Sequence, residues 1–430
     1  MNRLPIAALL VLALAAAGAR AQAPNQAENG SPERAYALED ALHLIRNDPR
    51  LQSSEQDVII AEARVNEAEL RFLPELGLQA SASKFNAIYP FALPETYHNI
   101  LLFPNTQENI YSTRGYFNLP LYEGQRTLNT YKLALAAQKQ AVANRDSVKM
   151  DLMLQVKEAF YRLLLAQERA AAADEHMQGV ERAVSAGGLG PWEAVEAEGA
   201  LATARAGASE TAHELESSKL AFLKSLNLEL DTPFHLTGSL TTTSVKVEVE
   251  RAVLWAMELR PELQSQTYKA QIDAIGVNLA NGRKYPTVSL GGDYELTSQT
   301  FPINKNNWDV TIGVKIPITY DLWSQLTQKR AEQRQGQLAR SDLQDQVRLQ
   351  VRQAAESLRY WQEEWPRREK QWRRIQSLYD AAAGKAGSEL ARIRARQSVL
   401  DQRLSYLASV TEHLLARARL ERAVGREIAP

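Results

Sequence analysis

The sequence predicts a mixed α+β membrane protein made of a duplicated half, each half carrying two barrel strands and a long αα-hairpin. The first observation is the duplication itself. Residues 49–53 read PRLQS and residues 261–265 read PELQS, and Leu73-Pro74 recurs as Tyr285-Pro286 at the same offset of 212 positions. The other observations are short stretches of alternating polarity and very long helical stretches. A period of about 200 residues is too long for a solenoid unit, so a whole half has been duplicated.

The N-terminus has the pattern of an export signal. Arg3 supplies positive charge, residues 6–17 form an apolar core, and Ala19-Arg20-Ala21 is a small-residue cleavage site. Residues 1–21 are therefore predicted to be a cleavable signal peptide, and the polar residues 22–35 a flexible lead-in. No later apolar run approaches the roughly 18 residues of a spanning helix. Because the chain has no cysteine, we expect neither a disulfide nor a lipid anchor on cysteine.

The first structural repeat is predicted to span residues 36–231. Its elements are a helix at 38–72 interrupted near Pro49, a strand at 74–83, a loop at 86–109, a strand at 110–122, a helical rod at 123–186, a turn at 187–191 and a return helix at 192–228. In the first strand, Leu76 and Leu78 alternate with Gly77 and Gln79, which is typical of a sheet with two unlike faces. Residues 123–186 contain no proline, and a helix of that length would extend about 95 Å.

An inter-repeat linker is predicted at residues 232–246, and the second repeat at 247–430. The elements of the second repeat are a helix at 247–284, a strand at 287–296, a shorter loop at 297–306, a strand from Trp308 to Ile316, a rod at 322–383, a turn at 384–387 and a return helix at 388–424. Pro366 interrupts the rod, where we expect a local kink or stagger. The last strand has the clearest alternation, and its apolar row is predicted to face lipid: Trp308, Val310, Ile312, Val314 and Ile316.

Four amphipathic strands in one chain cannot close a transmembrane barrel, which needs at least about eight. An open sheet leaves unpaired edges, so several chains must contribute, and three chains would supply twelve strands. A soluble β-sandwich is the alternative interpretation of each strand alone, but rods of about 95 Å have no short sheet to cover. The rods are rich in alanine, and small side chains let helices pack side by side as a wall. A plain antiparallel coiled-coil spacer is the alternative for the helices alone.

Several segments resemble the TolC-like outer-membrane factor family, the outer membrane efflux proteins. The resemblance covers residues 36–425 and rests on the order and duplication of four segments. These are the first hairpin tip from Gly188 to Leu201, the return helix from Ile393 to Gly425, and the strand-to-helix corners at Leu119–Gly124 and Ile316–Asp321. It implies a homotrimer with a twelve-strand β-barrel on a periplasmic α-helical tunnel. It also implies an exit duct in the outer membrane of a Gram-negative bacterium, which docks an inner-membrane pump through a periplasmic adaptor (membrane fusion) protein.

The hairpin tips are the predicted gate. The residues assigned to it are Gly188, Leu189, Gly190 and Glu193 in the first tip and Gly384, Gly387, Arg392 and Arg394 in the second. Tips of the resembled family commonly carry aspartates, which implies a narrowed mouth, yet Ala391 occupies the matching place in the second tip. Residues 123–231 contain 16 acidic and 12 basic side chains, whereas residues 320–430 contain 14 acidic and 21 basic. We therefore predict that acidic and basic hairpins alternate around the closed mouth, although two solvated faces would have the same composition.

Catalysis finds no support in the sequence. The histidines lack metal-ligand spacing, no G-x-S-x-G or phosphate-loop motif occurs, and we expect no catalytic residue, metal or cofactor. The near balance of 50 basic and 51 acidic residues argues against nucleic acid as a partner. Trp361, Trp365 and Trp372 lie along one helical face and are predicted to pack in the core or between subunits, with a ligand-binding strip as the alternative. Phe301 and Trp308 fit an aromatic girdle at the edge of the membrane.

Three functions remain open from the sequence. The first is the exit duct of a tripartite efflux system, and the second is the exit duct of a type I protein-secretion system. The third is a periplasmic coiled-coil structural or adaptor protein, which has no use for a lipid-facing row such as Trp308 to Ile316. No residue predicts whether the cargo is a drug, a metal ion or a polypeptide.

Overall fold

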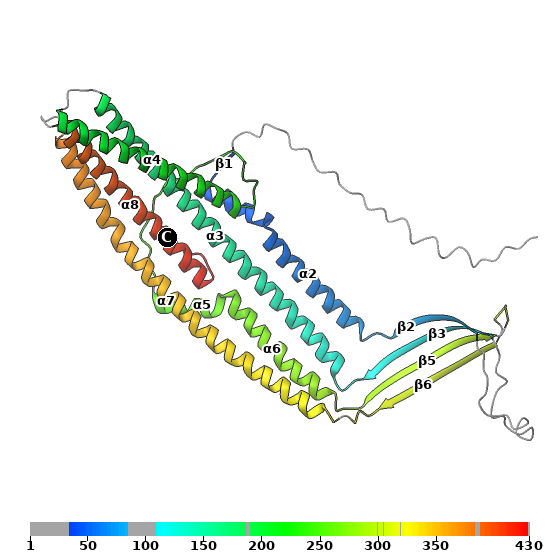
Figure 1. The fold of residues 1–430 in the computed structure, drawn as a ribbon. Helices are drawn as coiled ribbons and strands as arrows, with labels where there is room; N and C mark the ends of the chain where they lie inside the picture. Colours follow the sequence, from blue (N-terminus) through cyan, green and yellow to red (C-terminus); the bar gives the residue numbers. More distant parts are fainter. Residues whose placement is uncertain are drawn as a thin grey trace, which may run out of the picture.

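A computed structural model describes residues 34–84, 109–185, 190–298, 300–303, 305–318, 320–382 and 388–428. The chain is long and narrow, with a small sheet at one end and two helical hairpin turns at the other (Figure 1). The predicted signal peptide, most of the first loop at 86–109 and the tip residues Gly188, Leu189, Gly384 and Gly387 lie outside the described residues.

Four antiparallel strands form the sheet. They are β2 (Glu75–Lys84), β3 (Asn109–Tyr122), β5 (Thr287–Ser298) and β6 (Lys305–Lys315), in the spatial order β2-β3-β5-β6. The two strands of each repeat therefore form a hairpin, and the central β3–β5 pair joins the repeats (Figure 1). All four strands agree with the predicted segments, because alternating polarity over about ten residues is specific for a half-exposed strand.

Two very long helices and their return helices form the helical part. They are α3 (Arg126–Ser185), α4 (Pro191–Ser225), α7 (Leu322–Ala382) and α8 (Glu389–Val424). The 60 residues of α3 correspond to about 90 Å of helix. The helices lie side by side as a wall, with α8 between α3 and α7 near the hairpin turns (Figure 1). Helix α7 continues through Pro366 without ending.

Shorter helices complete the wall on the side of the sheet. The first repeat contributes α1 (Leu38–Leu44), the 3₁₀ turn η2 (Ile45–Asn47) and α2 (Pro49–Leu70), and the second contributes α5 (Val249–Leu259) and α6 (Pro261–Gly282). The prediction of one continuous helix at 247–284 is wrong, because the chain turns at Arg260 as it turns at Asp48. The ψ angles are 122° and 126°, since the residue before a proline is forced out of the α region.

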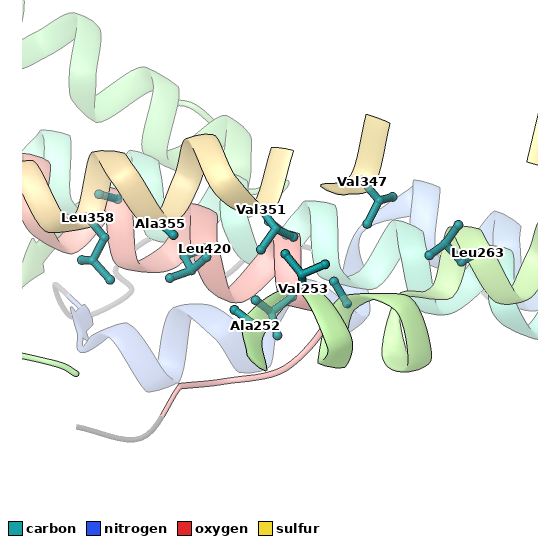
Figure 2. Packing of buried hydrophobic residues seen from close by; sticks show 12 residues of the cluster. Ala252, Val253, Leu263, Val347, Val351, Ala355, Leu358 and Leu420 are labelled. Atoms are coloured by element: carbon teal, nitrogen blue, oxygen red, sulfur yellow. The ribbon is translucent and has the colours of Figure 1, made fainter. Parts of the chain in front are cut away.

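The middle of the molecule holds two hydrophobic clusters, one in each repeat. In the second repeat, residues of α5 and α7 such as Val253, Val351 and Leu358 surround Leu420 of α8, which is fully buried (Figure 2). In the first repeat, Phe160 of α3 and Phe222 of α4 occupy the equivalent place with Leu226. Each cluster lies where a return helix, α4 or α8, ends beside the short helices of the same repeat. The packing therefore joins the hairpin part of the wall to the part near the sheet.

A two-stranded parallel sheet lies beside the hydrophobic cluster of the first repeat. It pairs β1 (Arg34–Tyr36) with β4 (Phe234–Leu236). The prediction assigned Arg34 and Ala35 to the flexible lead-in and β4 to the linker, whereas both segments are ordered here. The Tyr36 and Phe234 rings approach to 6.3 Å between centroids, so the strands are held by their own cluster contacts as well as by the backbone.

Candidate functional site

The sheet has one apolar face that spans all four strands. In the β5–β6 register, Trp308 lies opposite Tyr294, Ile312 opposite Leu290, and Val314 opposite Val288. Directly opposite residues point to the same side of an antiparallel sheet. The predicted row Trp308, Val310, Ile312 and Val314 therefore lies on one face, with exposed fractions between 61% and 74%. Ile316 is equally exposed but follows the last residue of β6.

The apolar face continues across β3 and β2. Leu290 lies opposite Leu119, and Phe117 lies between Gly292 on β5 and Leu76 on β2. Leu76 and Leu78 expose 75% and 80% of their surface. A register shifted by one residue in any strand would mix apolar with polar side chains, so the alignment of four independent strands specifies a single apolar surface.

The opposite face of the sheet is polar and internally paired. Arg114 on β3 donates to Asp293 on β5 at 2.6 Å, and Ser112 donates to Glu295 at the same distance. Asp309 on β6 lies directly opposite Asp293. A sheet with one apolar and one charged face suits a boundary between lipid and water.

Both outer edges of this sheet are open. In the described part of the chain, β2 pairs only with β3 and β6 pairs only with β5, although β6 is 11 residues long. A long strand edge carries unpaired N–H and C=O groups, which favour pairing with another chain. The described sheet therefore has a free backbone edge on each outer strand.

At the first hairpin tip, Glu193 caps its own helix. The backbone N–H of Gly190 donates to the Glu193 carboxylate at 3.2 Å, a capping-box contact at the start of α4. The predicted gate residue Arg394 instead forms an ion pair with Glu196, and Arg392 forms one with Glu389 at 3.4 Å. Among the described residues, the partner of Arg394 is thus Glu196, while Glu193 contacts the start of its own helix.

Sequence reasoning missed Glu196, although its position was informative. Glu196 lies one helical turn after Glu193, and Ile393 beside Arg394 packs against the first hairpin near Val180 and Leu201. This contact brings the start of α8 against α3 and α4 near the tip, where Arg394 reaches the Glu196 carboxylate on α4. The two tips are therefore held together by a small apolar cluster and one exposed ion pair.

A ladder of ion pairs continues from the tip along the seam between α3 and α8. Arg403 pairs with Glu168 at 2.8 Å and Arg419 with Glu158 at 2.9 Å, and Arg396 pairs with Glu175. The opposite charges of the two hairpins are thus matched along the length of the wall. Pairs that are about 40% exposed contribute only about 0–1 kcal/mol each, so the ladder sets register more than stability.

The ladder ends in a buried cluster where α3, α6 and α8 meet. Arg422 donates to Asp151 at 2.6 Å and also to Glu262, which receives a second contact from Arg260 at 3.2 Å. Burial raises the pKa of Glu262, but the hydrogen bond and charge of Arg422 outweigh burial and lower it overall. Burial lowers the pKa of Arg260. The cluster joins the end of α8 to α3 and α6, and the charge of Arg422 keeps Glu262 ionised.

The tryptophan strip of α7 is partly buried and packs mainly against α8. Trp361 lies against the second hydrophobic cluster, and Trp372 stacks on Tyr406 of α8 at 5.5 Å. The Trp365 ring lies 6.5 Å from that of His413, a fully buried histidine on α8. These contacts join α7 to α8 along their length, which is the packing role that the spacing predicted.

Buried His413 ties the inter-repeat linker to α8. Its Nδ1 lies 2.7 Å from the Thr242 hydroxyl, and its Nε2 has no hydrogen-bond partner among the described residues. Burial, assisted by the positive charge of Arg417, lowers the pKa of His413 below its ordinary value of about 6.5. A proton on this ring would thus be a buried and unpaired charge.

We expect acid to destabilise the fold through His413. Since the unfolded chain binds this proton more tightly than the folded chain, stability falls as pH drops from about 7 to about 5, by about 1.4 kcal/mol per unit of pKa depression. His413→Phe keeps the aromatic contact and removes the proton site, so its unfolding midpoint should depend less on pH. Denaturant unfolding of both proteins across this range is the measurement. Equal pH slopes would exclude this role for His413.

No described helix is long and apolar enough to cross a membrane. No group of three or more histidine, aspartate or glutamate side chains is placed to hold a metal ion in the described part of the chain.

Comparison with known proteins connects this architecture to channels. The sequence profile of the outer membrane efflux protein family matches residues 43–227. No curated protein matches the chain. Solved structures of outer membrane proteins, CmeC, MtrE and VceC among them, are similar in fold over nearly the whole chain.

The CmeC outer membrane channel of Campylobacter jejuni is similar with a TM-score of 0.77 at 14% identity, covering 91% of this chain and 87% of CmeC. The open-state MtrE channel of Neisseria gonorrhoeae gives 0.75 at 17%, covering 91% and 89%. The outer membrane protein VceC of Vibrio cholerae gives 0.73 at 16%, covering 91% and 97%. The resemblance to TolC-like outer-membrane factors is thereby confirmed, by the family profile over the first repeat and by the fold over both repeats.

Proposed function

Since this chain has the fold of TolC-like outer-membrane channels, we propose that it is one subunit of a homotrimeric exit duct of a tripartite efflux system. The duct lies in the outer membrane of a Gram-negative bacterium, with a large periplasmic part and a cleaved signal peptide at residues 1–21. It performs no chemistry and uses no cofactor. An inner-membrane pump, reached through a periplasmic adaptor protein, supplies the energy.

The observation that supports the duct best is the two-faced sheet with open edges. Its apolar face includes Leu76, Leu290 and Ile312, and its polar face includes Arg114 and Asp293. The outer edges of β2 and β6 have no partner strand among the described residues. Every backbone group in a bilayer must be paired, so such a sheet can enter lipid only as part of a closed barrel. Three copies supply twelve strands, with lipid outside and water inside. A periplasmic adaptor or coiled-coil spacer would have no use for this surface.

The helical wall then becomes the periplasmic tunnel. The chain contributes four helical strands at each level, so three copies give a ring of twelve. At about 90 Å, α3 and α7 are long enough to carry the path from the outer membrane far into the periplasm. The hairpin tips with Glu196 and Arg394 are the end that faces the adaptor and the pump, and we infer that the gate lies there.

Fractionation and conductance test this function together. We expect a detergent-requiring trimer in the outer membrane that conducts weakly in planar bilayers, because the tips hold the tunnel narrow. Arg394→Glu should raise the conductance at low salt. Adding Glu196→Arg should rebuild the ion pair with reversed charges and return the conductance to the low level of the unchanged protein. Each pair contributes up to about 1 kcal/mol and is screened within about 10 Å at 0.1 M salt.

Glu193→Gln serves as the matched control, because Glu193 contacts its own helix terminus and not the second hairpin. A monomer that stays in solution after ultracentrifugation without detergent would contradict the duct. A trimer whose conductance ignores both Arg394→Glu and the double reversal would contradict only the placement of the gate.

A further inference from the structure

The two repeats correspond residue by residue along the wall. Leu154-Gln155-Val156-Lys157 of α3 recurs as Leu349-Gln350-Val351-Arg352 of α7, 195 positions later. Helix α4 corresponds to α8 with an offset of 198, because Asn227 and Gly425 end the two return helices with φ of 54° and 85°. Helix α2 corresponds to α6 with an offset of 212, as the prolines at their starts show.

Within one chain, a seam forms where the second repeat packs on α3. Helices α6 and α8 lie along α3, which also contacts α2 and α4 of its own repeat on the other side. Helix α7 has α5, α6 and α8 beside it and no other extensive contact with a described helix. In a ring of copies, the free side of α7 must receive α2 and α4 of the next chain. The known seam on α3 is then a template for the seam between copies.

We propose that α7 joins the neighbouring copy in the register that the seam on α3 defines, through three ion pairs. This inference rests on the proposed trimer and specifies its interface. The pairs are Asp342 with Arg50, Glu356 with Lys219, and Glu363 with Arg205, the second member of each belonging to the neighbouring copy.

The first pair derives from the buried cluster. Ser147 of α3 donates to Glu262 of α6 at 3.0 Å within the chain. The offset of 195 converts Ser147 to Asp342, and the offset of 212 relates Glu262 to Arg50. A polar contact inside the chain thus corresponds to an acid–base pair between copies. The Arg50 side chain is 55% exposed and Asp342 is exposed, so both can reach a neighbour.

The third pair derives from the ion-pair ladder. Glu168 of α3 pairs with Arg403 of α8 at 2.8 Å. The same offsets convert these residues to Glu363 and Arg205. Both charges are preserved, and both side chains are more than half exposed in the single chain. The ladder that sets the register within the chain therefore has a counterpart between copies.

The second pair derives from Tyr161, which is partly buried on α3 one turn after Lys157. Lys157 pairs with Glu421 of α8 at 2.7 Å, and Arg417, one turn before Glu421, pairs with the same side chain at 3.2 Å. The counterpart of Tyr161 is Glu356, and the counterpart of Arg417 is Lys219. Among the described residues, the Glu356 carboxylate forms an ion pair with Arg359 one turn away at 2.7 Å, and Lys219 pairs with Glu216 in the same way. Such local helix pairs contribute about 0.3–0.5 kcal/mol, so exchanging them for a contact between copies costs little.

Two other contacts of the template also convert without conflict. Lys157 with Glu421 becomes Arg352 with Leu223, and Glu158 with Arg419 becomes Gln353 with Ala221. These pairs place no like charges opposite each other. A register shifted by one turn would lose the match, because like charges or unpaired charges would then meet across the seam.

Thiol cross-linking tests the register directly, because the chain has no cysteine of its own. Lys219→Cys combined with Glu356→Cys should give covalent dimers and trimers on denaturing gels after treatment with a short bis-maleimide. A bridging reagent is needed because long side chains that pair across a seam leave their Cβ atoms farther apart than a disulfide allows. The two positions lie at opposite edges of the wall of one chain, so a link within the chain is not expected.

The matched control moves one thiol along the same face of α7. Asp345 precedes Glu356 by 11 residues, which is three turns and about 16 Å, and it is also exposed. Lys219→Cys with Asp345→Cys should lose the cross-linked species. A detergent-stable trimer that links equally through both pairs, or through neither, would overturn the register. Absence of any trimer in detergent would instead overturn the proposed duct.

Discussion

Val310→Arg is expected to prevent accumulation of the trimer in the outer membrane. Val310 is the middle residue of the apolar row on β6 and is 61% exposed in the single chain. In a barrel its side chain faces the hydrocarbon near the middle of the bilayer, where arginine costs about 2–4 kcal/mol per strand. Three copies multiply this cost in one assembly. Outer-membrane fractionation, followed by gels of heated and unheated samples, measures the loss.

Thr311→Arg is the control for this experiment. Thr311 is the next residue on β6, lies on the polar face and contacts Asp309 at 3.0 Å. An arginine there would point into water beside a carboxylate, so assembly should stay near the level of the unchanged protein. A trimer yield from Val310→Arg as high as that from the unchanged protein and from Thr311→Arg would show that the apolar row does not meet lipid and would refute the barrel.

Arg422→Met is expected to produce the largest loss of stability in the helical part, about 3 kcal/mol. Arg422 is 11% exposed and neutralises Glu262, which keeps only Arg260 and Ser147 when the guanidinium is removed. Breaking a buried pair from one side costs about 3–5 kcal/mol, and the remaining partner reduces the effect toward the lower end. Chemical denaturation followed by circular dichroism of the helices provides the measurement.

Arg403→Met is the matched comparison. It removes the same side chain from the same helix, but the Arg403–Glu168 pair is about 40% exposed on both sides. Its loss should cost no more than about 1 kcal/mol. Two variants of equal stability would mean that the cluster around Arg422 is solvated in solution and does not fix the end of α8.

Much of the architecture could be predicted from the sequence because strong periodic patterns determine it. The four strands follow from alternation, and the rods from long stretches that stay helical. The break at Arg260 was missed even though Pro261 repeats Pro49, because the helical pattern of apolar residues continues on both sides of it. The short pair β1–β4 was missed for another reason. Three residues per strand give no period, and their pairing is decided by contacts of Tyr36 and Phe234 with the core.

The contacts between the two hairpins were predicted only in part, and the gate itself stays a prediction. The acidic first hairpin and the basic second hairpin do face each other, which the charge counts suggested. The partner of Arg394 could not be chosen, because Glu193 and Glu196 are one turn apart and only tertiary packing decides between them. Glu193 satisfies the backbone of its own helix start, a local role that competes with any contact between hairpins.

The placement of β3 beside β5 has a consequence for how the chain reaches its native state. Arg114 and Asp293 touch across this pair although 179 residues separate them in sequence. Closing a loop of that length costs about 4–5 kcal/mol of chain entropy before any strand contact compensates it. The hairpins α3–α4 and α7–α8 need only local closure and form sooner. The sheet, with its apolar face and open edges, therefore assembles late, after both repeats have been synthesised. Late assembly limits the time during which those edges can pair with the wrong chain.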